Sequence, residues 1–299
     1  MSLAFKTEME FAYGEPSVMG PGVSRIVANN ASALTFKGTN TYLVGTDQLA
    51  VIDPGPGDPA HRDAILKAAA GRPITHILAT HAHRDHVDGL DALRDATGAK
   101  TYAFPHASRR APHSPGVVES EYTNHDFPID VALAHDDRIE GEGWKLTALH
   151  TPGHAPDHVC FALEGTGIVF CGDHVMAWNT TVVAPPDGRM SDYIRSLELL
   201  LERDDELLLP GHGGRITAPR RTAKAYLLHR RWRDQAILEA VRNGTDTVRK
   251  LLPVIYSDLD PKVVGAATAS LRAHIEYLAE RGLVAWEDPA DVDCAAVPL

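Results

Sequence analysis

The chain has 299 residues, of which 44% are hydrophobic and 23% are charged, as in a globular protein with a sizeable core. No apolar run approaches the roughly 18 residues that a membrane-spanning helix needs, so we expect no membrane partner. The net charge of −11 argues mildly against nucleic acid as a partner.

The first third of the chain predicts alternating strands and helices. Residues 40–52 are typical of a β-hairpin, because two β-rich runs flank a Gly-Thr-Asp turn. The next segments are predicted in the order helix, strand, helix, strand, at 60–73, 74–80, 87–98 and 100–105. This alternation indicates an α/β fold.

The middle of the chain predicts a second group of strands. Apolar runs at 144–150, 157–164 and 167–173 leave few residues between them, so part of the sheet system should be antiparallel. The amphipathic segment 191–206 should form a helix with Ser191 as its N-cap. Residues 207–214 should form a strand that runs into a glycine-rich loop.

After about residue 222 helices dominate. They are expected at 223–244, 246–256 and 261–282, followed by a short strand at 283–288 and a loosely held tail. Three helices and a terminal β-element suggest a small winged-helix-like domain. We therefore divide the chain into domains at 1–222 and 223–299.

Basic residues gather at the start of the second domain. Residues 220–299 carry 12 Lys/Arg and 11 Asp/Glu, a balance of +1, against −12 for residues 1–219. The close group consists of Arg220, Arg221, Lys224, Arg230, Arg231 and Arg233. Two interpretations stay open: a solvated helix face, or a surface for an anionic substrate.

Potential metal ligands follow four apolar strands within a few residues. The strand at 74–80 precedes the run HAHRDH, and the later strands precede His154, Asp173 and His212. Carboxyl ends of strands form the usual crevice for a site in α/β proteins. Four such coincidences in order would rarely arise by chance. Other histidines are expected to be ordinary surface or hydrogen-bonded residues: His61, His106, His113, His125 and His135.

The ligand chemistry points to a pair of metal ions. Five histidines and two aspartates are too many for one tetrahedral ion, but they are enough for two ions that share a hydroxide. Neutral imidazole and carboxylate suit zinc, with iron or manganese less favoured. Because no thiolate takes part, the site should be catalytic, with positions open to water.

The motifs THAHRDH, TPGH, GD and PGHG, spread over residues 80–214, resemble those of the metallo-beta-lactamase superfamily. The motifs GTNTYLVG and VIDPG extend the likeness towards the N-terminus. The resemblance implies an α/β fold of the four-layer αββα kind, with two mixed sheets between helices. It makes residues 1–222 the catalytic domain.

The resemblance also implies the role of each ligand. The first metal would take His81, His83 and His154, and the second would take Asp85, His86 and His212, with Asp173 bridging both. Asp53 would orient a ligand. His158 would be either a similar support or a satisfied structural histidine.

The order of motifs into the C-terminal helices is similar to that of the beta-lactamase-like protein 2 subfamily, whose members add a winged-helix-like domain. The resemblance implies that a hydroxide held by the metals attacks a small ester, thioester or lactone, with Asp85 and Asp173 as catalytic residues. Residues 176–188 should line the pocket. Trp178, Asn179 and Thr180 are candidates for substrate contact or for loop packing.

Single-stranded RNA is the alternative substrate, because relatives in that subfamily cleave RNA and the basic group favours it. The acidic catalytic domain and the lack of an RNA-binding signature favour a small molecule. The winged helix could equally serve packing or a homodimer. A DNA-binding regulator would not need seven metal ligands.

The cysteines bear on location. Cys160, Cys171 and Cys294 are far apart in the sequence, which argues against a disulfide framework. The N-terminal residues lack the long apolar centre of a signal peptide. We therefore expect a cytoplasmic protein.

Overall fold

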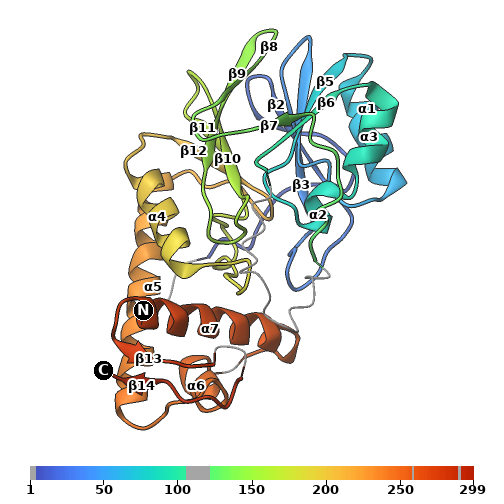
Figure 1. Cartoon of the computed structure of the whole chain (residues 1–299). Coiled ribbons are helices and arrows are strands. Elements are labelled where there is room, and N and C mark those ends of the chain that lie inside the picture. The colour runs from blue at the N-terminus through green and yellow to red at the C-terminus, as the bar shows by residue number, and fades with distance from the viewer. Residues whose placement is uncertain (1–4, 106–121, 258, 289–290) are drawn as a thin grey trace.

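The structure is a computed structural model that describes residues 5–105, 122–257, 259–288 and 291–299. Two β-sheets lie side by side with helices on their outer sides, and a group of helices packs below them (Figure 1). The expected ordinary histidines His106 and His113 lie outside the described residues.

The first sheet has seven strands in chain order. They are β1 (Ser17–Gly20), β2 (Val23–Val27), β3 (Asn40–Val44), β4 (Leu49–Ile52), β5 (Ile74–Leu78), β6 (Lys100–Ala103) and β7 (Val131–Ala132). Neighbours from β1 to β4 pair antiparallel, whereas those from β4 to β7 pair parallel. The predicted hairpin at 40–52 and the next two strands are confirmed, while β1, β2 and β7 were not predicted.

The second sheet has five strands, in the order β12-β11-β10-β9-β8. They are β8 (Arg138–Gly141), β9 (Trp144–His150), β10 (Val159–Leu163), β11 (Ile168–Gly172) and β12 (Leu207–Pro210). Pairing is antiparallel from β9 to β11, as predicted. The strand β8, which was not predicted, pairs antiparallel with β9, and β12 pairs parallel to β11. Both sheets are therefore mixed.

Helices cover the outer face of each sheet. The first sheet carries α1 (Pro59–Ala69), α2 (Arg84–Val87) and α3 (Leu90–Thr97), and the second carries α4 (Met190–Leu201) and α5 (Pro219–Arg242). The start of α1 follows from its sequence, because the Asp58 side chain accepts a hydrogen bond from the Ala60 N–H and Pro59 fits the first turn.

Three apolar clusters hold these layers together. Residues such as Tyr42, Phe161 and Phe170 fill the space between the two sheets. Ile65 and its neighbours join the first sheet to α1 and α3. Tyr193 of α4 belongs to the cluster between the second sheet and its helices. This is the four-layer αββα sandwich that the resemblance implied.

The C-terminal region contains α6 (Val248–Ile255), the 3-10 turn η1 (Pro261–Val263), α7 (Val264–Glu280) and the strand pair β13 (Val284–Ala285) and β14 (Val297–Pro298). The helix α5 spans the predicted domain boundary at 222. Its residues Ala223 and Tyr226 belong to the sandwich cluster, whereas Ile237 and Val241 belong to the C-terminal cluster.

Two local predictions are wrong. Ser191 is not the N-cap of α4, because the helix begins at Met190 and its cap is Arg189, which makes no side-chain capping bond. Met190 is buried in the core, so packing rather than capping sets this start. The chain end is not simply loose either: β14 pairs antiparallel with β13, and Ala296 is buried.

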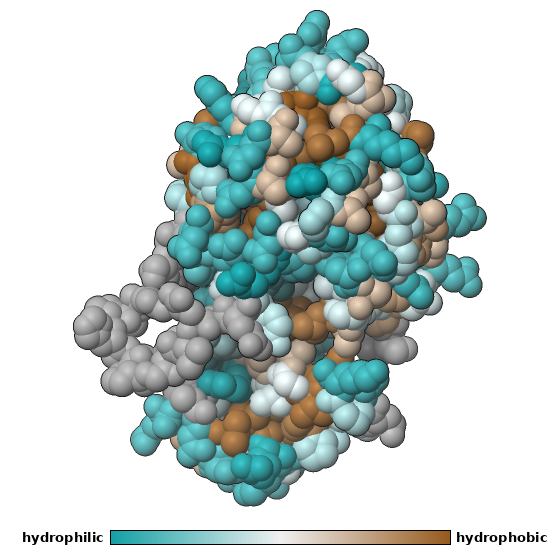
Figure 2. Space-filling model, turned by 90° about the vertical axis from the view of Figure 1, so that its right-hand side faces the viewer, coloured by the Kyte–Doolittle hydropathy of each residue, from teal (hydrophilic) through white to brown (hydrophobic). Residues whose placement is uncertain are grey.

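On the face shown in Figure 2, hydrophilic residues predominate and apolar residues gather in small separate patches. Within the described ranges, every helix is too short or too polar to cross a membrane.

Candidate metal centre

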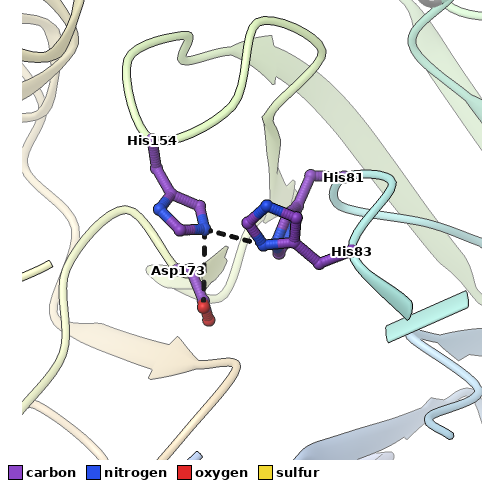
Figure 3. A group of neighbouring side chains, drawn as sticks. All are labelled: His81, His83, His154 and Asp173. Atoms are coloured by element: carbon purple, nitrogen blue, oxygen red, sulfur yellow. Dashed lines mark hydrogen bonds and ion pairs between the residues drawn. The ribbon is translucent and has the colours of Figure 1, made fainter. Parts of the chain in front are cut away.

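The seven side chains predicted as metal ligands lie together at one end of the sandwich. They form two groups, and within each group the potential ligand atoms all lie within 4.8 Å of one another: His81, His83, His154 and Asp173, and then Asp85, His86 and His212. Figure 3 shows the first group, whose side chains point toward one another from three segments, with His81 and His83 on the same one. The structure thus brings together every residue of the predicted set.

Strand ends position these side chains. His81 and His83 follow β5, and Asp173 follows β11. His212 follows β12, which lies parallel to β11, so both residues emerge at the same edge of the second sheet. His154 comes from the turn between β9 and β10.

In the first group, the imidazole nitrogens lie close together around one position. His83 Nδ1 lies 2.8 Å from His81 Nε2 and 3.1 Å from His154 Nε2. His154 Nε2 lies 3.7 Å from Asp173 Oδ2, whose partner oxygen Oδ1 is buried and makes no hydrogen bond. The nearest ion-pair partner of this Oδ1 is His86 Nε2 at 3.6 Å, and a buried carboxylate oxygen without a hydrogen bond costs free energy unless a nearby cation compensates it. This donor set fits a metal ion.

The second group is equally tight. The Nε2 atoms of His86 and His212 are 3.3 Å apart, and Asp85 Oδ2 lies 3.4 and 3.2 Å from them. Asp173 Oδ2 is also 3.3 Å from His212 Nε2. Asp173 therefore stands between the two groups.

Backbone carbonyls orient two of the imidazoles. His154 Nδ1 donates to the carbonyl oxygen of Val182 at 2.7 Å, and His212 Nδ1 donates to that of Gly38 at 3.3 Å. With Nδ1 carrying the hydrogen, each ring presents an Nε2 lone pair to the centre.

Asp53 orients one of the imidazoles of the centre, as the resemblance implies. Its Oδ2 lies 2.9 Å from His86 Nδ1 and accepts a hydrogen bond from Thr80 Oγ1. Its Oδ1 accepts from the Thr80 backbone N–H at 2.8 Å. The same threonine hydroxyl lies 3.0 Å from His81 Nδ1. Asp53 is thus linked to both groups.

His158 is a supporting residue rather than a member of either group. Its Nε2 accepts a hydrogen bond from the Asp173 backbone N–H at 3.1 Å, and its Nδ1 lies 2.9 Å from Thr151 Oγ1. Sequence reasoning missed a further support, Thr39, whose hydroxyl donates to Asp85 Oδ2 at 2.9 Å. The motif GTNTYLVG contains this threonine, but nothing in the sequence marks its partner.

Electrostatics differ between the groups. In the first, burial and the neighbouring His154 lower the pKa of His83 to about 3. In the second, burial opposes the charge on His86, but the carboxylates of Asp85 and Asp53 outweigh it and raise the pKa to about 9. Metal binding at the second group therefore has to displace protons.

The predicted pocket residues lie on the loop after Asp173. Trp178 is half-buried and stacks on Phe36, with ring centroids 4.9 Å apart. Asn179 is exposed, and its side chain accepts a hydrogen bond from the backbone N–H of Thr180 at 2.8 Å. Their contact with a substrate stays a prediction.

Three other histidines were expected to be ordinary. His61 is buried, with Nε2 2.7 Å from Thr41 Oγ1. The side chain of His135 is 44% exposed, and His125 is exposed as well. None of the three belongs to either metal-ligand group.

Comparisons with known proteins agree with this geometry. The family model described as "Metallo-beta-lactamase superfamily" matches residues 34–212, and "Beta-lactamase associated winged helix domain" matches residues 247–290. The chain is 30% identical to "Beta-lactamase-like protein 2 homolog" of Drosophila melanogaster, over 90% of this chain and 91% of that protein. It is also 30% identical to "Lactamase-like protein adaB" of Aspergillus niger, over 89% and 82% respectively.

A solved structure gives the same result. A metallo-beta-lactamase family protein from Thermus thermophilus superposes with a TM-score of 0.75 at 26% identity, over 94% of this chain and all of the other. Fold, strand-end histidines and family match coincide, and the chain therefore belongs to the metallo-beta-lactamase superfamily and carries the winged-helix domain associated with it.

Proposed function

We propose that this protein is a hydrolase with two zinc ions, acting on a small ester, thioester or lactone. The position of Asp173 carries the proposal. Its Oδ2 lies 3.7 Å from His154 Nε2 of the first group and 3.3 Å from His212 Nε2 of the second. A carboxylate shared by two sets of imidazoles suits a pair of adjacent metal ions.

Zinc is proposed because imidazole nitrogens dominate the donor set and no thiolate joins it. Carboxylate oxygens also suit iron or manganese, which remain the alternatives. When bound, two such ions supply Lewis acidity and a water of lowered pKa.

Asp85 is assigned the proton transfer. Its side chain is 28% exposed, against 9% for Asp173, so it is the carboxylate that solvent and substrate can reach. The Thr39 hydroxyl fixes Oδ2 of Asp85. The carboxylate accepts the proton of the attacking water and returns it to the leaving group. Asp173 lies between the two ligand groups and holds them at a fixed separation. Both aspartates are therefore proposed as catalytic residues.

The aromatic pair of Phe36 and Trp178 supports a small apolar substrate. Their rings stack with an interplanar angle of 10°. A Cβ atom added at Gly213 would lie 2.6 Å from the Trp178 ring, so this ring packs beside the residue that follows His212. Pockets for small molecules combine such apolar walls with a few polar groups. Asn179 and Thr180 are proposed as those polar neighbours.

Cleavage of single-stranded RNA is the second candidate, and the winged-helix match at 247–290 favours it. The basic group on α5 supports it weakly. Arg230 and Arg233 are buried, and Arg220 and Arg231 pair with Asp204 and Glu198. Because phosphate binding depends on exposed basic side chains, the small substrate is preferred.

Metal analysis and a substrate panel test the proposal. Elemental analysis of the purified protein should find about two zinc-like ions per chain, as a binuclear site requires. A thioester, a lactone and a labelled single-stranded RNA are then offered at matched salt to the wild type and to Asp173→Ala. Absence of metal would refute the proposal. Cleavage of RNA alone, lost in Asp173→Ala, would replace it with the second candidate.

A cytoplasmic location belongs to this proposal. The three cysteines are free thiols, and Cys160 and Cys171 are buried in neighbouring strands. Reduced cysteines are typical of a reducing compartment. A homodimer through the C-terminal domain stays a prediction, and size-exclusion chromatography with light scattering tests it.

A further inference from the structure

We propose that Arg230, on the helix α5, is a positioning residue for the metal centre. It acts by holding the backbone of Thr181 and Val182 against His154 and Asp173. This inference rests on the proposed metal-dependent function. It places part of the machinery outside the segment 34–212 that matches the superfamily.

The short segment 181–182 touches both metal-ligand residues. The Thr181 hydroxyl lies 2.8 and 3.0 Å from the carbonyl oxygens of Asp173 and His174. The Val182 carbonyl accepts the His154 Nδ1–H at 2.7 Å. A shift of this segment would therefore turn the His154 ring and move the Asp173 backbone together.

Arg230 anchors this segment from the other side. Its Nη2 donates to the carbonyl oxygen of Thr181, so Thr181 is held at its carbonyl by α5 while its hydroxyl reaches Asp173. The guanidinium also lies 5.1 Å from the ring centroid of Tyr193. The Tyr193 hydroxyl donates to the His174 carbonyl at 2.7 Å.

The burial of Arg230 argues that it has a specific task. Only 2% of the residue is exposed, and none of the ion pairs found among the described residues involves it. A buried guanidinium without a carboxylate partner is costly, and a chain keeps it where its hydrogen bonds are needed. The bond to Thr181 is the one that reaches the metal centre.

A second side chain of α5 holds the same loop. The Tyr226 hydroxyl donates to the Met176 carbonyl at 2.6 Å and also contacts the Asn179 carbonyl. Tyr226 and Arg230 are four residues apart, so they lie on one face of the helix. Together they fix the loop near both of its ends, between residues 176 and 181.

The next turn of α5 is tied to the C-terminal helices. Arg233 donates to the Ile255 carbonyl at the end of α6, and Asp234 pairs with His274 of α7 at 2.6 Å. Figure 1 shows α5 running from the sandwich into this group of helices. The C-terminal helices α6 and α7 thus hold α5 in place, and α5 in turn holds the loop beside the metal centre.

Zinc affinity measures this role directly. Zinc binding is followed by competition with a chromogenic chelator for wild type, Arg230→Met, Arg230→Lys and Tyr226→Phe. Loss of a residue that orients a ligand weakens metal binding about 10- to 100-fold, and we expect about tenfold for Arg230→Met. Arg230→Lys should recover part of this loss, since it keeps one donor. Tyr226→Phe should show a smaller decrease, of about threefold on the same scale.

The matched control is Arg231→Met, because Arg231 is the neighbouring, exposed arginine of the same helix. It should leave zinc affinity unchanged. Urea unfolding of each metal-free variant separates positioning from folding. A variant that loses stability yet binds zinc like the wild type in its folded state would overturn the inference.

The remaining outcomes also support or overturn the role of Arg230. If Arg230→Met does not fold, wild-type zinc affinity in both Arg230→Lys and Tyr226→Phe would overturn the inference, and weaker affinity in both would support it. A wild-type protein that binds no zinc would overturn the proposed function together with this inference. A zinc-binding wild type whose three variants match it would overturn the inference alone.

Discussion

The carboxylate of Asp53 shows how a single residue can set the chemistry of the centre. It accepts hydrogen bonds from the Thr80 N–H and hydroxyl, and it faces His86 Nδ1 at 2.9 Å. Asp53 holds its backbone at φ 53°, a conformation that Asp and Asn adopt more readily than other residues with a side chain. The residue type is therefore constrained by its backbone and by its acceptors.

Asp53→Asn should weaken zinc binding by about 10- to 100-fold while preserving the fold. Asparagine suits the same backbone, and its carbonyl can still accept the Thr80 N–H. Its amide N–H₂ would then face His86 Nδ1 and favour the tautomer whose Nε2 carries a hydrogen, which cannot bind metal. Chelator competition measures the affinity. The exposed Asp63→Asn serves as control, and equal affinities of Asp53→Asn and wild type would contradict the role.

His61 should make stability depend on pH. Burial lowers its pKa to about 4, against about 6.5 in the unfolded chain. Below pH 6.5 the unfolded state binds the proton first, so the free energy of unfolding falls as pH drops from about 6.5 to about 4, by up to about 3 kcal/mol. Urea unfolding at pH 7, 5.5 and 4.5 in chelator checks this. His61→Gln should lose less stability over this range, and a parallel loss in both proteins would rule out His61 as the cause.

At the scale of elements, the loops that follow strands determine the shape of the cage. Gly211 precedes His212 in the loop after β12. A Cβ atom there would lie 2.5 Å from Asp173 Oδ1 and 2.7 Å from His86 Cε1. The backbone of Gly211 is not in the left-handed region. Glycine is needed for space between the two groups, and not for an unusual backbone angle.

Gly211→Ala should therefore damage metal binding more than folding. The added methyl group pushes Asp173 and His86 apart, which should lower zinc affinity at least about tenfold, while overpacking costs about 1–3 kcal/mol of stability. Zinc titration and urea unfolding give the two values. Gly214→Ala is the matched control, since its nearest neighbours would be 3.6 and 3.7 Å away. Full zinc affinity in Gly211→Ala would show that the cage tolerates the methyl group.

The elements themselves were largely predictable. Buried apolar runs such as Leu49–Ile52 and Val159–Leu163 carry the strand signal directly. Four strands escaped prediction. β1 contains glycine and is partly exposed, β7 has two residues, and the short runs of β2 and β8 are interrupted by charged residues. The start of α4 was misplaced because burial of Met190 overrode the capping preference of Ser191.

The candidate site was predictable only in part, for a similar reason. Histidines that follow apolar strands can be recognised in the sequence, and Asp53 lies in the motif VIDPG, which is part of the family resemblance. Supports from distant segments cannot be recognised in this way, since Thr39 is 46 residues from Asp85 and the Val182 carbonyl carries no residue-type signal. Arg230 belongs to a basic group that predicted a solvated face or an anion-binding surface, yet the structure buries it.

Considered whole, the sandwich cluster around Tyr193 and the C-terminal cluster around Leu271 are two apolar centres that share the helix α5, and Ala273 of α7 also packs in the sandwich cluster. The helix α5 has 24 residues, and its two halves belong to different clusters. Unfolding of the C-terminal helices would remove Ala273 from the sandwich cluster and expose apolar surface in both regions. The sandwich and the C-terminal helices should therefore be coupled in stability, although the family match treats them as separate modules.

Zinc binding should consequently protect the C-terminal helices, far from the ligands. A ligand that binds only the folded state stabilises every segment that unfolds with its site, by about 2.7 kcal/mol at 100 times the dissociation constant. Hydrogen exchange in moderate urea, read by mass spectrometry with zinc and with chelator, should slow in peptides from Val248–Ile255 and Val264–Glu280 as much as in β5 and β11. Ile237→Ala, which weakens the C-terminal cluster on α5, should reduce that shared protection in α6 and α7 but leave the zinc effect on β5. Protection confined to the sandwich in the wild type would mean that α5 does not couple the two centres.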